Sequence, residues 1–166
     1  MLGSQMTVLQ KLLNSYEEGA YGVVFFVEQS YAIKVFKRCT DVPENHVNAV
    51  FQAELEAYRI ASETEELKAV IPEFFGAITC TQVLDNAGKD ISDKFYLSFA
   101  YKMSKVDGDF KKCGLNDERL ESAFRRVGIH HTTDASVLFE DGEVKCIVDF
   151  ATKEHELPSN YIPSDL

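Results

Sequence analysis

The most regular hydrophobic pattern of the chain lies in its first quarter. Val23–Glu28 and Tyr31–Lys37 are two runs rich in β-branched and aromatic residues, separated by Gln29-Ser30. Two such runs around a short polar break are typical of a β-hairpin with a tight turn. The pattern therefore predicts two antiparallel strands that are neighbours in the sequence.

The second run contains a lysine in the middle of an apolar stretch. Side chains alternate between the two faces of a strand, so Lys34 and Ala32 are expected on the same face. An ammonium group on a buried face needs a counter-charge. The apolar residues of 43–62 recur with a period of 3.6 and predict a helix, whose apolar stripe includes Glu54 but not Glu56. We therefore predict that Glu54 pairs with Lys34.

The remaining pattern predicts a few further elements. Thr7–Tyr16 is expected to be a short helix that leads into a strand, and Asn116–Val127 a short helix capped by Asn116. A strand that begins at Pro72 can extend as far as Leu84, and Lys94–Met103 is the next strand. Few helices and several strands in this order predict the α+β class.

A second hairpin is predicted near the end of the chain. Val137–Phe139 and Val144–Val148 flank a Glu-Asp-Gly turn, with Asp134 just before the first strand and Asp149 just after the second. A hairpin brings its open ends together, so both acids are expected to face one site. Two close carboxylates suit metal-phosphate chemistry, in which one binds Mg²⁺ and the other orients a hydroxyl group. A surface hairpin with acidic ends explains the same residues equally well.

Composition narrows the function classes. The 166 residues include 45% hydrophobic residues and twelve Phe, enough for a sizeable core, and the net charge is −10. This charge would repel a phosphate backbone, so no nucleic-acid partner is expected. No apolar run reaches the roughly 18 residues of a membrane span, and no membrane partner is expected. The four cysteines are far apart and predict thiols of a reducing compartment.

A glycine-containing turn precedes the first hairpin. Gly19 and Gly22, in the pattern G-x-x-G, leave room for backbone N–H groups to approach a phosphate. Ordinary turns produce the same pattern, and by itself an ordinary turn is the better interpretation.

Taken together, these segments resemble the protein kinase fold. The resemblance rests on E-E-G-A-Y-G at 17–22, Y-A-I-K at 31–34, the helix around Glu54, H-x-x-x-D ending at Asp134 and V-D-F at 148–150. It implies an amino-terminal lobe over 1–103, with a five-stranded antiparallel sheet and one helix. It also implies a minimal carboxy-terminal lobe over 104–166, without the activation segment and later helices. The truncated form is similar to the HopBF family, minimal kinases that bacteria inject into host cells by type III secretion.

The resemblance implies an ATP-dependent serine/threonine protein kinase that uses Mg²⁺. Lys34, fixed by Glu54, would bind the α- and β-phosphates, Asp149 would bind the metal, and Asp134 would orient the substrate hydroxyl group. Phe99 would form the back wall of the nucleotide pocket, and 100–103 the hinge beneath the adenine. The full set of implied nucleotide-binding residues is Gly19, Ala20, Tyr21, Gly22, Val24, Ala32, Lys34, Phe99, Tyr101 and Met103. The implied partner is a host protein substrate, the ninety-kilodalton heat-shock chaperone. The resemblance also implies that the kinase is a monomer and acts in the host cytoplasm.

The chain departs from the kinase pattern at several positions. Glu17 replaces the first glycine of the phosphate loop, and Ala151 replaces the glycine of D-F-G. Asp134 and Asp149 are fifteen residues apart (149 − 134), about three fewer than in an ordinary kinase. These departures leave the metal-binding carboxylate in place.

An alternative alignment uses the strand before the turn. It places His131 at the position of the catalytic acid and Ser136 at the position of a metal-binding Asn, and the chain then resembles a pseudokinase. A small-molecule phosphotransferase is a third possibility, because such enzymes share the fold. His130 and His131 are not expected to bind a metal together, because adjacent side chains point apart and no third ligand has zinc-site spacing.

Overall fold

Residues 6–155 are described by a computed structural model, which divides them into two compact units. Unit 1 comprises residues 6–51 and 77–102, and unit 2 comprises 52–76 and 103–155. The outer ends of the two predicted lobes, residues 1–5 and 156–166, lie outside the described residues.

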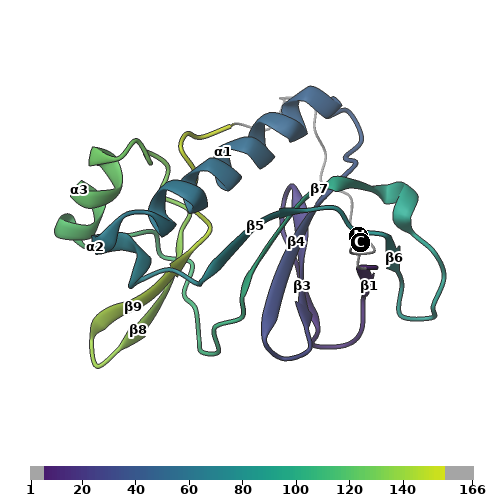
Figure 1. Cartoon of the computed structure of the whole chain (residues 1–166), viewed down its shortest axis with the longest axis horizontal. Coiled ribbons are helices and arrows are strands. Elements are labelled where there is room, and N and C mark those ends of the chain that lie inside the picture. The colour runs from purple at the N-terminus through teal and green to yellow at the C-terminus, as the bar shows by residue number, and fades with distance from the viewer. Residues whose placement is uncertain (1–5, 156–166) are drawn as a thin grey trace, which may run out of the picture. The chain divides into compact units, whose positions relative to one another are not determined.

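The central element is a five-stranded antiparallel sheet, which confirms the predicted α+β class and the predicted sheet. Its strand order is β2-β3-β4-β7-β5. Figure 1 shows β3 and β4 as a long hairpin in blue and purple. The strands are β2 Tyr16–Glu18, β3 Gly22–Val27, β4 Tyr31–Lys37, β7 Phe95–Ser104 and β5 Phe74–Ile78.

The β3–β4 hairpin forms as the sequence pattern predicts. Glu28 and Gln29 both have positive φ angles, 55° and 62°, the geometry of the turns that match the twist of a hairpin. Ile33 and Val35 on β4 belong to one buried cluster of unit 1, whereas Lys34 between them is half-buried on the opposite face. This cluster of buried residues comprises Leu9, Val23, Phe25, Ile33, Val35, Cys80, Val83, Ile91, Phe95 and Ala100.

Two of the predicted elements are wrong in the first unit. Residues 7–16 do not form a helix: β1 Val8–Gln10 is a strand that pairs in parallel with β6 Gln82–Leu84. The strand expected to run from Pro72 to Leu84 is interrupted after β5. The backbone N–H of Cys80 donates to the carbonyl of Leu97, and β6 leaves the five-stranded sheet to form a two-stranded one with β1. Both errors arise because the partner strand lies far away in the sequence.

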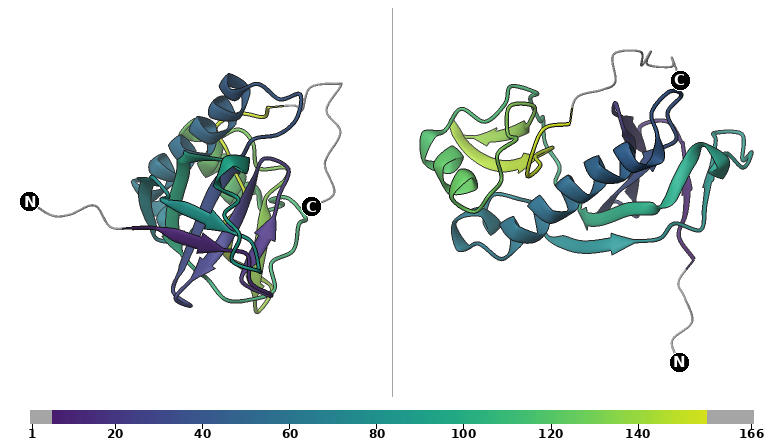
Figure 2. Two further views of the ribbon diagram at one scale, coloured as in Figure 1. Left: turned by 90° about the vertical axis from the view of Figure 1, so that its right-hand side faces the viewer. Right: turned by 90° about the horizontal axis from the view of Figure 1, so that it is seen from above.

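Helix α1, Glu44–Ser62, begins in unit 1 and ends in unit 2. In unit 1, Phe51 contacts Phe36 of β4 edge to face, with ring centroids 5.4 Å apart. It also stacks on Phe99 of β7 at 5.5 Å and 12°. The first part of α1 therefore covers the face of the sheet formed by β4 and β7, which can be followed in the two views of Figure 2.

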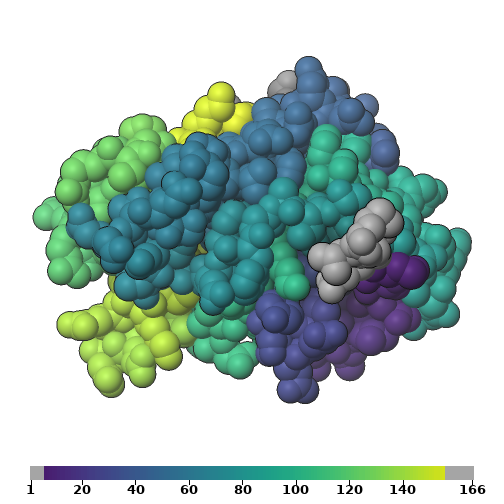
Figure 3. Space-filling view, viewed as in Figure 1, coloured from purple at the N-terminus to yellow at the C-terminus, as the bar shows by residue number. Residues whose placement is uncertain are grey.

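Unit 2 contains the predicted second hairpin. β8 Ser136–Glu140 and β9 Glu143–Val148 pair from Ser136↔Val148 to Glu140↔Glu143, with a bulge at Leu138/Phe139. Asp141 and Gly142 form the turn with φ angles of 53° and 80°. Figure 3 shows the tip of this hairpin exposed on the face in view, in yellow-green at the lower left.

Two short helices complete unit 2, α2 Glu65–Lys68 and α3 Glu118–Arg126. The predicted cap of α3 at Asn116 is wrong: the side chain of Asp117 accepts a hydrogen bond of 3.0 Å from the backbone N–H of Leu120. Asp and Asn are equally good caps, so the choice between neighbours depends on where the chain enters the helix. In unit 1, the single-turn helix η1 spans Ser92–Lys94.

The four cysteines are all free thiols, as predicted, with Cys80 and Cys146 buried. No helix within residues 6–155 is both long enough and apolar enough to cross a membrane.

Candidate functional site

The glycine turn and Lys34 form one group in unit 1. The backbone N–H of Gly19 donates to the carbonyl of Gly22 at 2.8 Å, which closes the turn between β2 and β3. A Cβ added at Gly22 would lie 2.8 Å from the carbonyl oxygen of Val35 and 3.2 Å from Cε of Lys34. The stem of Lys34 therefore passes directly over Gly22, and only glycine leaves room for it.

Further contacts fix this group. Nζ of Lys34 lies 5.0 Å from the centroid of the Phe36 ring, a cation–π distance. The hydroxyl group of Tyr21 is 3.0 Å from Nε2 of His46, which ties the glycine turn to the start of α1. His46 was missed in the sequence because only the fold brings the first turn of the helix to this loop.

The other residues predicted to bind the nucleotide in unit 1 lie on β3, β4 and β7 and in the turn before β3. Val24 is directly opposite Lys34 in the ladder, and Ala32 is buried opposite Phe26. Tyr101 is buried with its ring centroid 6.4 Å from that of Phe36. Ala20 is exposed in the turn, where its carbonyl accepts a weak hydrogen bond from the thiol of Cys39.

The predicted back wall and hinge lie on β7. Phe99 packs between Phe51 and Tyr96, and these aromatic contacts alone explain its position. β7 continues without a break through residues 100–103 to Ser104, and Met103 is the first residue of this segment that belongs to unit 2. The predicted contacts of Phe99 and Met103 with an adenine stay predictions.

Glu54 is buried on α1, at 9% exposed, whereas Glu56 is exposed and bonds to Arg59. The helix face predicted from the 3.6-residue pattern is therefore confirmed. Glu54 belongs to unit 2 and Lys34 to unit 1, so the ion pair predicted between them stays a prediction.

In unit 2, the open end of the β8–β9 hairpin holds Asp149. The hydroxyl group of Ser136 donates to Oδ2 of Asp149 at 3.1 Å, so the two predicted metal-binding residues are brought together. The backbone N–H of Asp149 donates to the hydroxyl oxygen of Tyr58 at 3.2 Å. Asp149 has a φ angle of 66°, a left-handed conformation that Asp tolerates better than most residues.

Tyr58 and Phe150 anchor this end of the hairpin. The Phe150 ring is buried, with centroids 4.4 Å from Tyr58 on α1 and 5.1 Å from Phe124 on α3. Burial raises the pKa of Tyr58 well above its usual value, and the nearby charge of Asp149 raises this pKa further. The phenol therefore stays neutral and acts as a fixed hydrogen-bonding group. The sequence assigned Tyr58 only to the apolar stripe and missed this contact.

Asp134 lies in the loop of residues 128–135, and two neighbouring segments of the chain are hydrogen-bonded to this loop. His131 and Ala151 exchange two backbone hydrogen bonds of 3.0 Å, an isolated bridge between the loop and the segment after β9. On its other side, the N–H of Gly114 donates to the carbonyl of Ala135. A Cβ at Gly114, where φ is 71°, would lie 2.7 Å from the carbonyl oxygen of Thr133. The close approach of this segment therefore requires glycine.

Asp134 lies at the surface with its side chain 78% exposed and Oδ2 3.3 Å from Nε2 of His131. Within the described residues, this contact with His131 is the one polar interaction of the carboxylate. It does not cap the turn that Ala135 closes on Thr132, so the turn gives no structural reason for an acid here. The carboxylate is accessible to solvent.

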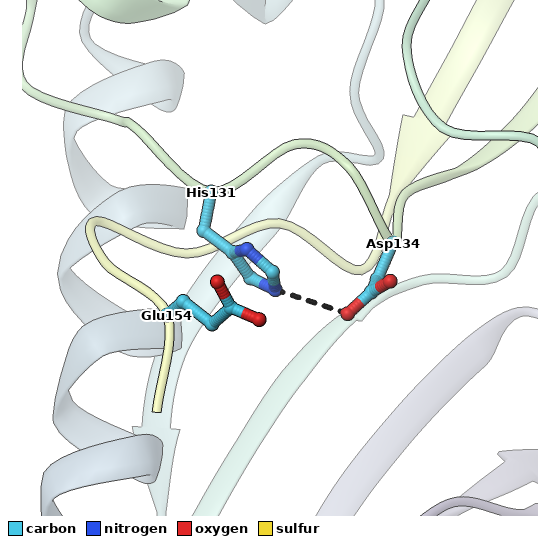
Figure 4. A group of neighbouring side chains, drawn as sticks. All are labelled: His131, Asp134 and Glu154. Carbon is cyan, nitrogen blue, oxygen red and sulfur yellow. Dashed lines mark ion pairs between the residues drawn. The ribbon is translucent and has the colours of Figure 1, made fainter. Parts of the chain in front are cut away.

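A third residue joins His131 and Asp134. Their ligand atoms and a carboxylate oxygen of Glu154 all lie within 4.8 Å of one another. Figure 4 shows the three side chains pointing toward one another, His131 and Asp134 from the loop and Glu154 from the segment after β9. The sequence predicted no metal site at the His130-His131 pair, and Glu154 was missed because nothing in its local sequence places it beside His131.

A scan against protein-family models and a search of curated proteins both returned no match for this chain.

Proposed function

We propose that this protein is an ATP-dependent serine/threonine protein kinase of minimal form, with a truncated kinase-like fold. The observation that carries the proposal is the open end of the β8–β9 hairpin. There Ser136 and Asp149 are hydrogen-bonded to each other, and the loop that bears the exposed carboxylate of Asp134 enters the same hairpin end two residues earlier. Paired acids on either side of a hairpin end suit phosphoryl transfer, which depends on positioning and charge neutralisation.

In unit 1, the glycine turn and Lys34 would bind the phosphates of ATP. The backbone of residues 19–22 turns tightly and leaves no side chain at Gly22 to block the stem of Lys34. An ammonium group next to a tight glycine turn suits a phosphate oxygen. Glu54 would hold the ammonium group in place, which gives a reason for a carboxylate on the buried face of α1.

In unit 2, Asp149 and Ser136 would hold Mg²⁺. They offer a carboxylate and a hydroxyl group, hard oxygen donors, and Mg²⁺ binds through one or two carboxylates together with substrate phosphates. Bound Mg²⁺ would neutralise phosphate charge. The hydrogen bond from Asp149 to Tyr58 and the burial of Phe150 keep the Asp149 carboxylate at the hairpin end.

Asp134 would accept a hydrogen bond from the hydroxyl group of the substrate and orient it toward the phosphate. The side chain of Asp134 is 78% exposed, and the one ion pair that it makes within residues 6–155 is with His131, so the carboxylate would be accessible to a protein substrate. The resemblance to the HopBF family further suggests the ninety-kilodalton heat-shock chaperone of a host cell as the substrate, reached after type III secretion. This part of the proposal rests on that resemblance alone.

Two observations favour a second candidate, a non-catalytic pseudokinase. The carboxylate of Asp134 is engaged by His131, and Ser136 stands where the kinase alignment has a metal-binding amide. A protein of this kind would bind a partner, or ATP, without transferring phosphate.

The test uses the purified full chain, Mg²⁺ and ATP labelled on the γ-phosphate, with and without a eukaryotic lysate. A labelled protein band that disappears in Asp149→Asn supports the proposal. Asp109→Asn is the matched control, because Asp109 lies in the same unit with an 88% exposed side chain. Bound ATP without transfer supports the pseudokinase, and label on a dialysable acceptor supports a small-molecule phosphotransferase. A labelled band other than the chaperone would refute only the proposed substrate.

A further inference from the structure

We propose that His131, Asp134 and Glu154 form a binding site for Zn²⁺ or a similar transition-metal dication. One imidazole nitrogen and two carboxylate oxygens, one from each acid, lie within 4.8 Å of one another. In tetrahedral zinc sites, bonds of about 2.0–2.2 Å place neighbouring ligand atoms about 3.3–3.5 Å apart. Nε2 of His131 and Oδ2 of Asp134 are already 3.3 Å apart. The side chain of Glu154 is exposed, which leaves it free to adjust to a metal ion.

The donor set selects the metal class. Mg²⁺ and Ca²⁺ bind through oxygen atoms, whereas Zn²⁺ and its neighbours in the first transition row readily accept imidazole nitrogen together with carboxylates. Three protein ligands leave one tetrahedral position open. The site is therefore chemically different from the oxygen donors Ser136 and Asp149, and high Mg²⁺ should not fill it.

The backbone holds the ligands in place before a metal arrives. His131 comes from the loop and Glu154 from the segment after β9, and these two segments are joined by the His131–Ala151 bridge. A third hydrogen bond, 3.1 Å long, runs from the N–H of His130 to the carbonyl of Thr152 and joins the same two segments. The Thr152 N–H in turn donates to the carbonyl of Ala53 on α1. Little backbone order must therefore be gained on binding.

Charge favours a dication at this place. Two carboxylates meet a single imidazole, and among the described residues Glu154 has no other ion pair or hydrogen bond. A neutral His131 leaves a local charge of −2, which Zn²⁺ would balance. The half-buried His131, with a side chain 16% exposed, is the most buried of the three ligands and would fix the position of the ion.

Occupancy has a functional consequence that rests on the proposed function. Asp134 is the carboxylate proposed to orient the substrate hydroxyl group, and a carboxylate that ligates Zn²⁺ cannot do so. Zn²⁺ is therefore an inhibitor that acts at Asp134 rather than by displacing Mg²⁺ from Asp149.

The binding test is calorimetric titration of the full chain with Zn²⁺ in excess Mg²⁺. Because thiolates also bind zinc, the background is Cys39→Ser/Cys113→Ser, which removes the two cysteines that are not buried. We expect one ion per chain and an affinity at least tenfold weaker in His131→Ala and in Glu154→Gln. Glu140→Gln is the matched control, because Glu140 is an exposed carboxylate paired with Lys145. Absence of binding, or an equal affinity in all four proteins, would overturn the proposal.

A second measurement separates this proposal from the proposed function. In the transfer assay, with Mg²⁺ constant and free Zn²⁺ set by a buffering chelator, Glu154→Gln should need at least tenfold more Zn²⁺ than the parent to halve its own Zn²⁺-free rate. Equal sensitivity of both proteins would refute inhibition through this site. A chain that binds Zn²⁺ through these residues but transfers no phosphate would refute the kinase and leave the metal site standing.

Discussion

The hydroxyl oxygen of Tyr58 accepts a hydrogen bond of 3.2 Å from the backbone N–H of Asp149, although the two residues are 91 positions apart. Asp149 adopts a left-handed conformation with φ at 66°. A left-handed conformation at a residue other than glycine costs of order 1–3 kcal/mol of folding free energy, and it persists only where the surrounding structure holds it. The bond to Tyr58 and the packing of Phe150 on the Tyr58 ring supply this support. A helix residue thereby sets the direction of the proposed metal-binding carboxylate.

Tyr58→Phe should therefore weaken both stability and transfer. The change removes the acceptor for Asp149 while keeping the ring that packs on Phe150, so we expect a loss of about 1 kcal/mol in the free energy of unfolding. The rate of phosphate transfer should fall further than folding alone explains, and urea unfolding and the transfer assay measure the two effects. Tyr96→Phe is the control, because within the described residues the Tyr96 hydroxyl group has no hydrogen bond. Equal transfer in both variants would contradict the positioning role.

Asp134→Asn should lower the transfer rate at least about a hundredfold, or ~3 kcal/mol in the barrier, because it removes the charge that orients the hydroxyl group. Stability should hardly change, since the carboxylate is exposed and contacts only His131 among the described residues. His131→Ala should retain transfer. The opposite result, full activity in Asp134→Asn and loss in His131→Ala, would assign the catalytic position to His131.

Lys34 and Glu54 are predicted to form an ion pair, and a double-mutant cycle measures it. Lys34→Met should abolish transfer, and we expect the cycle with Glu54→Gln to give a coupling energy of about 1–3 kcal/mol in urea unfolding. The Lys145–Glu140 pair is the matched control, because its two side chains are 3.2 Å apart and more than half exposed. An exposed pair of this kind contributes about 0–1 kcal/mol. A Lys34–Glu54 coupling no larger than that would show that the two residues do not pair.

Gly22→Ala should destabilise the protein by about 1–3 kcal/mol, because the new methyl group would overlap the carbonyl oxygen of Val35 and press on Lys34. The same change at Gly19, where the nearest atom is 3.3 Å away, should cost less. Urea unfolding compares the two variants. Displacement of Lys34 should also weaken ATP binding by Gly22→Ala, which equilibrium titration with the nucleotide measures. Equal stabilities would mean that the turn moves to make room.

The buried thiols predict a loss of stability in alkali. Burial raises the pKa of Cys80 to about 12 and the pKa of Cys146 to about 11. An unfolded thiol ionises from about pH 8.5 upward, so above this pH the unfolded chain binds fewer protons than the folded one and the free energy of unfolding falls. Each thiol contributes a slope of up to about −1.4 kcal/mol per pH unit between roughly pH 9 and 11.

The measurement is urea unfolding at several pH values, compared between the parent and Cys80→Ala/Cys146→Ala. The variant should be less stable near pH 7, because it leaves two small cavities, but its stability should fall less steeply with pH. Parallel curves would mean that both thiols ionise in the folded protein as they do in the unfolded chain.

Local structure was determined by the sequence itself. The β3–β4 and β8–β9 hairpins were predicted from short alternating runs and their turns, and the buried face of α1, with Glu54 inside and Glu56 outside, from a 3.6-residue period. These features depend on residues a few positions apart, whose backbone preferences and spacing act within one element. The order of the two acids around the second hairpin followed from the same local pattern.

Tertiary structure decided the contacts that define the sites. The pairing of β1 with β6 replaced an expected helix, because a strand 74 positions away supplied the hydrogen bonds. Tyr58 reached Asp149, and Glu154 reached His131, only after the chain had folded back across unit 2. Each of these contacts depends on the packing of whole elements against one another. No local period or motif encodes that packing, and so the sequence alone gave the residue types of the sites but not their neighbours.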